Sequence, residues 1–134
     1  MRLYFILVII CEFLVGAWVI VIYRGISDET VEEVGRFVHE RDWEKFHNPK
    51  DLAISINLEA SELLELFQWS GTDTSVRDKL PELKEELADT LMYCIMMSLR
   101  LDINLDEIIK AKLAVNKLKY PKEQVYGSHK KYDE

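Results

Sequence analysis

Residues 57–69 read NLEASELLELFQW and residues 84–93 read KEELADTLMY, and these two stretches decide the fold. Apolar residues recur in both at helical spacing, which predicts two amphipathic helices. Each helix carries two acidic residues three positions apart, and these are Glu59, Glu62, Glu86 and Asp89. Residues three apart lie on one face of a helix, so each helix presents a pair of carboxylates. Because unpaired charge is costly in apolar surroundings, a hard divalent cation is the natural partner.

The rest of the chain continues this helical pattern. A length of 134 residues suits one domain, and the few Gly and Pro residues favour an all-α fold. Asn48 followed by Pro49, and Asn104 followed by Glu107, are typical of helix N-termini. We expect helices near 28–41, 49–69, 81–101 and 104–120, joined by short connections as in a four-helix bundle.

The charge distribution limits the range of partners. A net charge of −7 argues against a nucleic acid polymer as the ligand. The acidic residues are concentrated in 27–109, whereas 110–134 is basic. A basic segment beside an acidic body suits a small anion that bridges a metal and lysines. The alternative is that lysines simply suit a helix C-terminus and a solvated tail.

The N-terminal segment is almost wholly apolar from Leu3 to Tyr23. As a helix it would span about 31 Å, which is close to the hydrocarbon thickness of a bilayer. Glu12 lowers the favourable free energy of insertion without reversing it. The segment therefore predicts an apolar N-terminal helix that anchors the protein in a membrane. The alternatives are a helix buried in an oligomer core, or an extension that the native protein does not use.

The two acidic helices predict a metal site if their carboxylates face each other. Four close carboxylates cannot all remain ionised without a cation. Mg²⁺ is the expected ion, with Mn²⁺ as a substitute, because Mg²⁺ bridges carboxylates to substrate phosphates. The lack of a Glu-x-x-His motif argues against a di-iron bundle. The spacing alone is also consistent with an alternative to a metal site, in which the two acidic pairs simply lie on solvent-exposed helix faces.

Two further groups of residues have both a binding and a structural interpretation. Lys112, Asn116 and Lys119 or Tyr120 follow one stripe of the last helix and could hold a phosphate, or form an ordinary exposed face. A set of aromatic residues flanks the acidic helices and could stack on a nucleobase, or belong to the core. This set comprises Trp43, His47, Trp69 and Tyr93.

Three stretches together resemble the MazG-like nucleotide pyrophosphohydrolases, and most closely their short dCTP pyrophosphatase branch. These stretches are RDWEKFHNPKDLAISINLEASELLELFQW (41–69), ELKEELADTLMY (82–93) and KLAVNKLKYP (112–121). The resemblance implies an all-α MazG-like bundle whose active site forms between subunits of a dimer or tetramer. The implied reaction converts a (d)NTP and water to the (d)NMP and pyrophosphate with Mg²⁺.

The resemblance also implies roles for individual residues. It makes Glu59, Glu62, Glu86 and Asp89 the metal ligands, and either Glu59 or Glu62 the group that positions or deprotonates the attacking water. By the same resemblance Lys112, Asn116 and Tyr120 hold the triphosphate, while Trp43, His47, Trp69 and Tyr93 line the base and sugar pocket. The cytosine-preferring branch tends to carry a histidine where this chain has Val34, which leaves the base preference open.

These observations predict three parts: an apolar segment over 1–26, a pyrophosphohydrolase domain over 27–121, and a polar tail over 122–134. The expected function is Mg²⁺-dependent hydrolysis of pyrimidine dNTPs such as dCTP, which removes non-standard or excess dNTPs from the nucleotide pool. The alternatives are a related hydrolase acting on dUTP or phosphoribosyl-ATP, and a membrane-anchored helical interaction module without turnover. The catalytic domain is expected in the cytoplasm, with or without the anchor.

Overall fold

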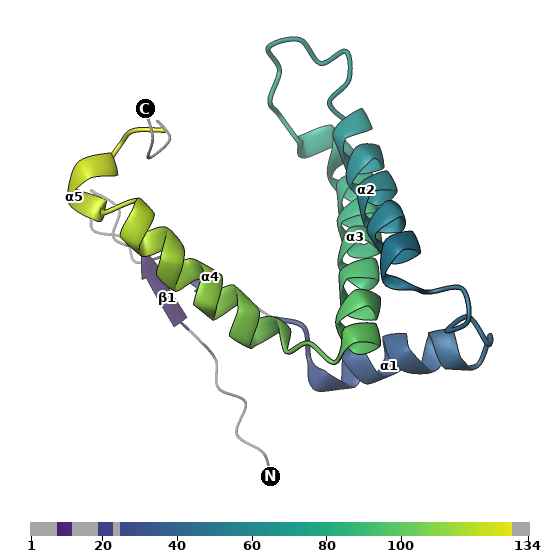
Figure 1. Ribbon diagram of the computed structural model, residues 1–134. Helices are drawn as coiled ribbons and strands as arrows, with labels where there is room; N and C mark the ends of the chain where they lie inside the picture. The colour runs from purple at the N-terminus through teal and green to yellow at the C-terminus, as the bar shows by residue number, and fades with distance from the viewer. Residues whose placement is uncertain (1–7, 12–18, 23–24, 130–134) are drawn as a thin grey trace. The chain divides into compact units, whose positions relative to one another are not determined.

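The computed structural model describes residues 8–11, 19–22 and 25–129. The chain divides into two compact units between Glu33 and Val34, and each unit is described by itself. From Asp28 onward the described elements are helical, which confirms the predicted all-α class (Figure 1).

The N-terminal unit contains a pair of short strands where a continuous helix was expected. β1 (Val8–Cys11) and β2 (Val19–Ile22) pair antiparallel, with Val8 opposite Ile22. The helix prediction is therefore wrong for these two stretches. The physical reason is composition, because seven of their eight residues are β-branched Val or Ile, whose stiff side chains favour extended backbone. The other residues of the predicted helix lie outside the described ones. Within the described residues, no helix combines the length and apolar character needed to cross a bilayer.

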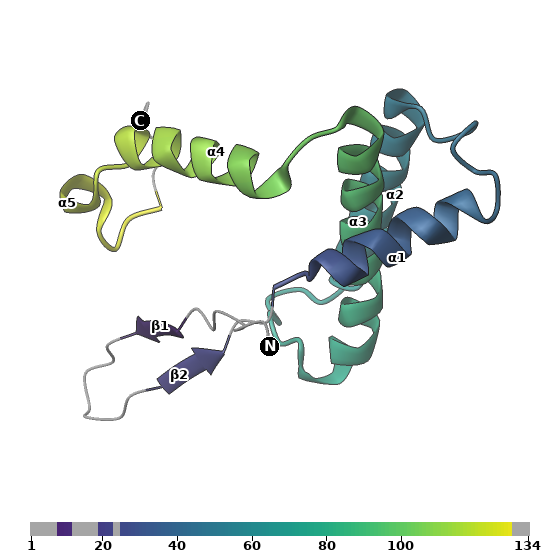
Figure 2. The ribbon, with the colours of Figure 1, turned by 90° about the horizontal axis from the view of Figure 1, so that it is seen from below.

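The second unit is built on a helical hairpin. α2 (Pro49–Glu65) and α3 (Leu80–Leu101) run side by side along most of their length, as both views show (Figures 1 and 2). Leu52 is only 1% exposed, and Ile95 and Met96 are also buried. These side chains form the apolar core that holds the hairpin together.

The start of α2 follows the predicted cap. The Asn48 side chain accepts a hydrogen bond from the Asp51 backbone N–H at 3.0 Å, and Pro49 occupies the first turn. A polar loop and a short 3₁₀ helix, η1 (Arg77–Lys79), connect α2 to α3. The cap fixes where α2 begins, and therefore which of its residues face α3.

α1 (Asp28–His39) precedes this hairpin in the chain, and its second half belongs to the second unit. Val34 and Val38 are its buried residues. A Cβ added to Gly35 would lie 3.4 Å from Leu99 Cδ1, so this part of α1 approaches the C-terminal end of α3 closely. A loop over residues 40–48 then connects α1 to α2.

The chain continues into α4 (Leu105–Lys119) and the one-turn helix α5 (Lys122–Val125). The Asn104 side chain caps α4 by accepting from the Glu107 backbone N–H at 3.2 Å, as predicted. Among the described residues, α4 has no extensive contact with another element. Several of its apolar side chains are consequently exposed, and these are Ile108, Ile109, Leu113, Val115 and Leu118.

Candidate active site

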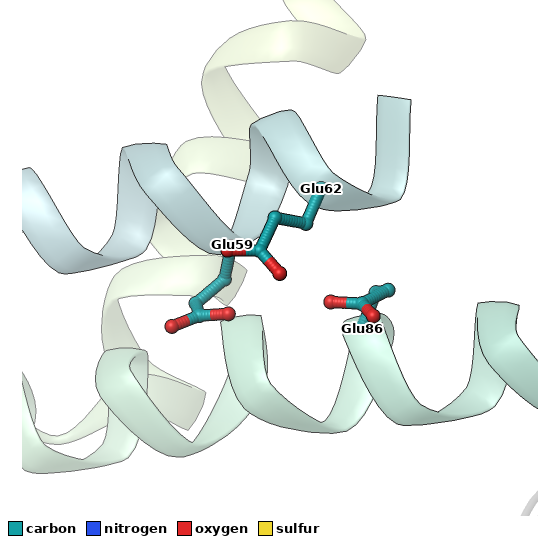
Figure 3. Close-up of side chains that lie close together, drawn as sticks. All are labelled: Glu59, Glu62 and Glu86. Atoms are coloured by element: carbon teal, nitrogen blue, oxygen red, sulfur yellow. The ribbon is translucent and has the colours of Figure 1, made fainter. Parts of the chain in front are cut away.

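The predicted acidic residues of α2 and α3 converge. One carboxylate oxygen from each of Glu59, Glu62 and Glu86 can be chosen so that all three lie within 4.8 Å of one another. Figure 3 shows Glu59 and Glu62 extending from α2 toward α3, and Glu86 extending from α3 into the same space. Their convergence follows from the i, i+3 spacing on α2 together with the side-by-side packing of the hairpin.

The electrostatics of this cluster are unfavourable for three ionised carboxylates. Burial raises the pKa of Glu59, and the charges of Glu62, Asp89 and Glu86 raise it further. Burial likewise raises the pKa of Glu86, with added repulsion from Glu62 and Asp89. Asp89 lies outside the three-residue group but contributes charge to both residues. The cluster therefore attracts positive charge.

The cluster fits a hard divalent metal ion. Among the described side chains, none of Glu59, Glu62, Glu86 and Asp89 forms an ion pair with Lys, Arg or His. Carboxylate oxygens are the ligands that Mg²⁺ prefers. Three carboxylates at this spacing are thus a chemically suitable site for such an ion.

Part of the predicted aromatic set lies together beside α1. The rings of Trp43 and His47 lie 6.1 Å apart and those of Phe37 and Trp43 lie 5.6 Å apart, both edge to face. Trp69, by contrast, is 91% exposed and has a positive φ of 68°. Tyr93 is half-buried on α3, four residues beyond Asp89. The structure brings Trp43 and His47 together, while the shared pocket of all four residues stays a prediction.

The predicted phosphate-binding residues lie on α4. Lys112 and Asn116 are within α4, and Tyr120 is its C-terminal cap, with its backbone N–H bonded to the Asn116 carbonyl. Since α4 has no extensive contact with α2 or α3 among the described residues, the single chain does not bring these residues to the acidic cluster. Their role stays a prediction.

A cavity of about 290 Å³ lies between α1, the following loop and the end of α3. It is lined by Gly35, Val38, Glu44, His47, Met96, Leu99 and Arg100. Of these, only His47 was expected in a binding site. The helical stripe that joins Asp89 and Tyr93 continues to Met96 and Arg100 at spacings of three and four, so this stripe was the available signal.

Comparisons with known proteins place this chain among nucleotide-hydrolysing enzymes. The model of the MazG-like family matches residues 54–134. dCTP pyrophosphatase 1 of Mus musculus is 35% identical, covering 82% of this chain and 70% of that protein. The Homo sapiens protein of the same name is 36% identical over 80% of this chain and 68% of its own.

A solved structure gives the same result. The chain in the crystal structure of a pyrophosphatase from Archaeoglobus fulgidus has 36% sequence identity to this chain and a TM-score of 0.66. The match covers 75% of this chain and 98% of that one. The chain belongs to the MazG-like family, which confirms the predicted resemblance.

Proposed function

We propose that this chain hydrolyses pyrimidine deoxynucleoside triphosphates such as dCTP to the monophosphate and pyrophosphate, with Mg²⁺ as the cofactor and Mn²⁺ as a substitute. At the level of enzyme class it is a nucleoside triphosphate pyrophosphohydrolase, as its 35% identity to dCTP pyrophosphatase 1 supports. The observation that carries the proposal is the convergence of Glu59, Glu62 and Glu86 between α2 and α3.

The acidic cluster has two tasks in this proposal. Glu59, Glu62, Glu86 and Asp89 would hold the metal ion, whose positive charge would offset the charge of the triphosphate oxygens when bound. Either Glu59 or Glu62 would position the attacking water or accept its proton, because a carboxylate close to the reacting water can act as a general base.

The remaining predicted residues would bind the substrate. Lys112 supplies a point charge for phosphate, and Asn116 and Tyr120 supply hydrogen-bonding groups. Trp43 and His47, which are already in ring contact, would border the base. Trp69 and Tyr93 would complete that pocket.

Pyrophosphate release tests the proposal directly. The protein is incubated with a panel of dNTPs, including dCTP and dUTP, and with phosphoribosyl-ATP, in the presence of Mg²⁺. Glu62→Gln should lower kcat by about 10²-fold or more, as expected for loss of a general base or a metal ligand. Glu65→Gln is the matched control, since it removes a charge from the same helix one turn away. No release from any substrate would instead favour a non-catalytic interaction module.

We also propose that the protein acts as a homo-oligomer, a dimer or a tetramer, in the cytoplasm. The exposed apolar residues of α4 support assembly, because among the described residues α4 has no extensive contact with another element, and an isolated helix of 15 residues is marginal in water. Fractionation of the full chain with a carbonate wash tests the location, and protein that stays in the membrane pellet would favour an anchor over this proposal.

A further inference from the structure

The loop after α1 begins with a turn that fixes the backbone at Trp43. The Trp43 backbone N–H donates to the Val38 carbonyl at 3.1 Å, and the Asp42 N–H donates to the His39 carbonyl at 2.9 Å. Asp42 has a positive φ of 52°. These two bonds around a left-handed residue define a Schellman motif at the end of α1. In this motif the residue after the left-handed one frequently makes an apolar contact with the last turns of the helix.

Phe37 provides that apolar contact on α1. The ring centroids of Phe37 and Trp43 lie 5.6 Å apart with an interplanar angle of 81°, so the two rings meet edge to face. Such a pair is favourable beyond the area that it buries, and it has a preferred relative orientation. Phe37 is 37% exposed and Trp43 is 40% exposed, so the core does not enclose either ring. The contact between the two rings therefore matters for their orientation.

Arg41 lies over the Phe37 ring and extends this contact into a stack. Its guanidinium carbon is 3.8 Å from the Phe37 ring centroid, and its Nη1 donates to the Phe37 carbonyl at 2.9 Å. Beyond Trp43, the His47 ring follows at 6.1 Å, and the His47 backbone N–H donates to the Trp43 carbonyl at 3.1 Å. Four side chains thus form one continuous stack that ties the loop to α1.

We propose that Phe37 and Arg41 are positioning residues, which hold the rings of Trp43 and His47 in the orientation that binds the nucleotide. This inference rests on the proposed function, in which Trp43 and His47 contact the substrate and the other two residues have no role. Phe37 and Arg41 act through the Trp43 ring. Side chains that are already ordered lose less conformational freedom when a ligand binds, so the stack lowers KM and takes no part in the chemical step.

Steady-state kinetics with dCTP and Mg²⁺ tests the role of Phe37. Phe37→Leu keeps an apolar side chain but removes the ring. It should raise KM by about fivefold, which is the size expected for loss of one aromatic pair. The value of kcat should stay within about twofold of the wild type, because only binding is affected. Phe37→Tyr retains the ring and should restore most of the wild-type KM.

The role of Arg41 is tested in the same assay. Arg41→Ala leaves all three rings in place but removes the group that lies over Phe37, and it should raise KM by about threefold. Arg36→Ala is the matched control, because it removes an exposed arginine from the last turn of the same helix. Its KM should equal that of the wild type.

The NMR signal of the Trp43 indole N–H separates positioning from a general loss of stability. The signal is assigned from its absence in Trp43→Phe. It should shift in Phe37→Leu, which lacks the neighbouring ring current, and also in Arg41→Ala, which keeps both rings.

The outcomes distinguish this inference from the proposed function. If the wild type hydrolyses nucleotides but Phe37→Leu and Arg41→Ala keep its KM, the positioning inference is wrong and the proposed function stands. The same holds if Phe37→Tyr is as impaired as Phe37→Leu. If the wild type releases no pyrophosphate from any nucleotide, the proposed function fails, and the positioning inference with it.

Discussion

The carboxylates of Glu59 and Glu86 resist ionisation in the folded chain, because burial and like charges raise the pKa of each. The folded state therefore binds these protons more tightly than the unfolded state does. The resulting penalty on stability is absent well below the ordinary carboxyl pKa of 4.5, and it grows as pH rises from there through the raised pKa values. A bound cation would remove this penalty by favouring the ionised forms.

Glu86→Gln should consequently stabilise the metal-free protein in a pH-dependent way. With a chelator present, the variant and the wild type should melt at similar temperatures near pH 4, and the variant should melt higher as the pH approaches about 8. Added Mg²⁺ should raise the melting temperature of the wild type more than that of the variant. A difference between the two proteins that does not change with pH would contradict this electrostatic account.

The sequence predicts some residues of the site better than others, for a physical reason. Glu59, Glu62 and Glu86 could be predicted because helical spacing places them on faces that a hairpin brings together. That Glu44 and Arg100 line one cavity could not be predicted. Their cavity depends on how α1 approaches α3, and the periodicity of single helices does not define that approach. The joint roles of Trp69, Tyr93 and the α4 residues stay predictions.

Among the secondary-structure elements, the helices were predictable from local chemistry. Asn48 and Asn104 each cap the helix that follows, as expected from their positions before Pro49 and three residues before Glu107. The strands Val8–Cys11 and Val19–Ile22 were not predicted, because an apolar run is consistent with either a helix or buried strands. β-branched composition was the signal that favoured strands.

The cap of α2 gives a prediction about stability. Asn48 accepts from the Asp51 backbone N–H and also donates from Nδ2 to the Asp51 carboxylate. Asn48→Ala should lower the free energy of unfolding by about 1 kcal/mol, the usual cost of losing such a cap. Urea titration followed by circular dichroism measures this change. Asn48→Ser, whose hydroxyl can accept from the Asp51 backbone N–H, should lose less, and equal losses in both variants would argue against capping as the cause.

At the scale of the whole molecule, α4 lacks an extensive contact with any other element within the part of the chain that the structure describes. Leu118 is 82% exposed, and Ile108, Ile109, Leu113 and Val115 are exposed along with it. In an oligomer these side chains would be buried against another copy. Leu118→Glu should therefore shift the protein toward the monomer in light scattering, whereas Lys117→Glu, at a neighbouring polar position, should not. An unchanged mass for Leu118→Glu would exclude this part of α4 from the interface.

Assembly also bears on catalysis, because Lys112 lies on α4 while Glu62 lies on α2, and these helices do not contact each other extensively among the described residues. If the site takes its carboxylates from one copy and its lysine from another, two inactive variants can complement each other. Glu62→Gln and Lys112→Ala should each lose activity alone. When the two variants are unfolded together and refolded as a mixture, part of the activity should return, because some mixed assemblies contain one site with both native residues. Mixing without refolding is the control and should recover less. Failure to recover activity in refolded mixtures shown to contain both variants would mean that each chain supplies its own lysine.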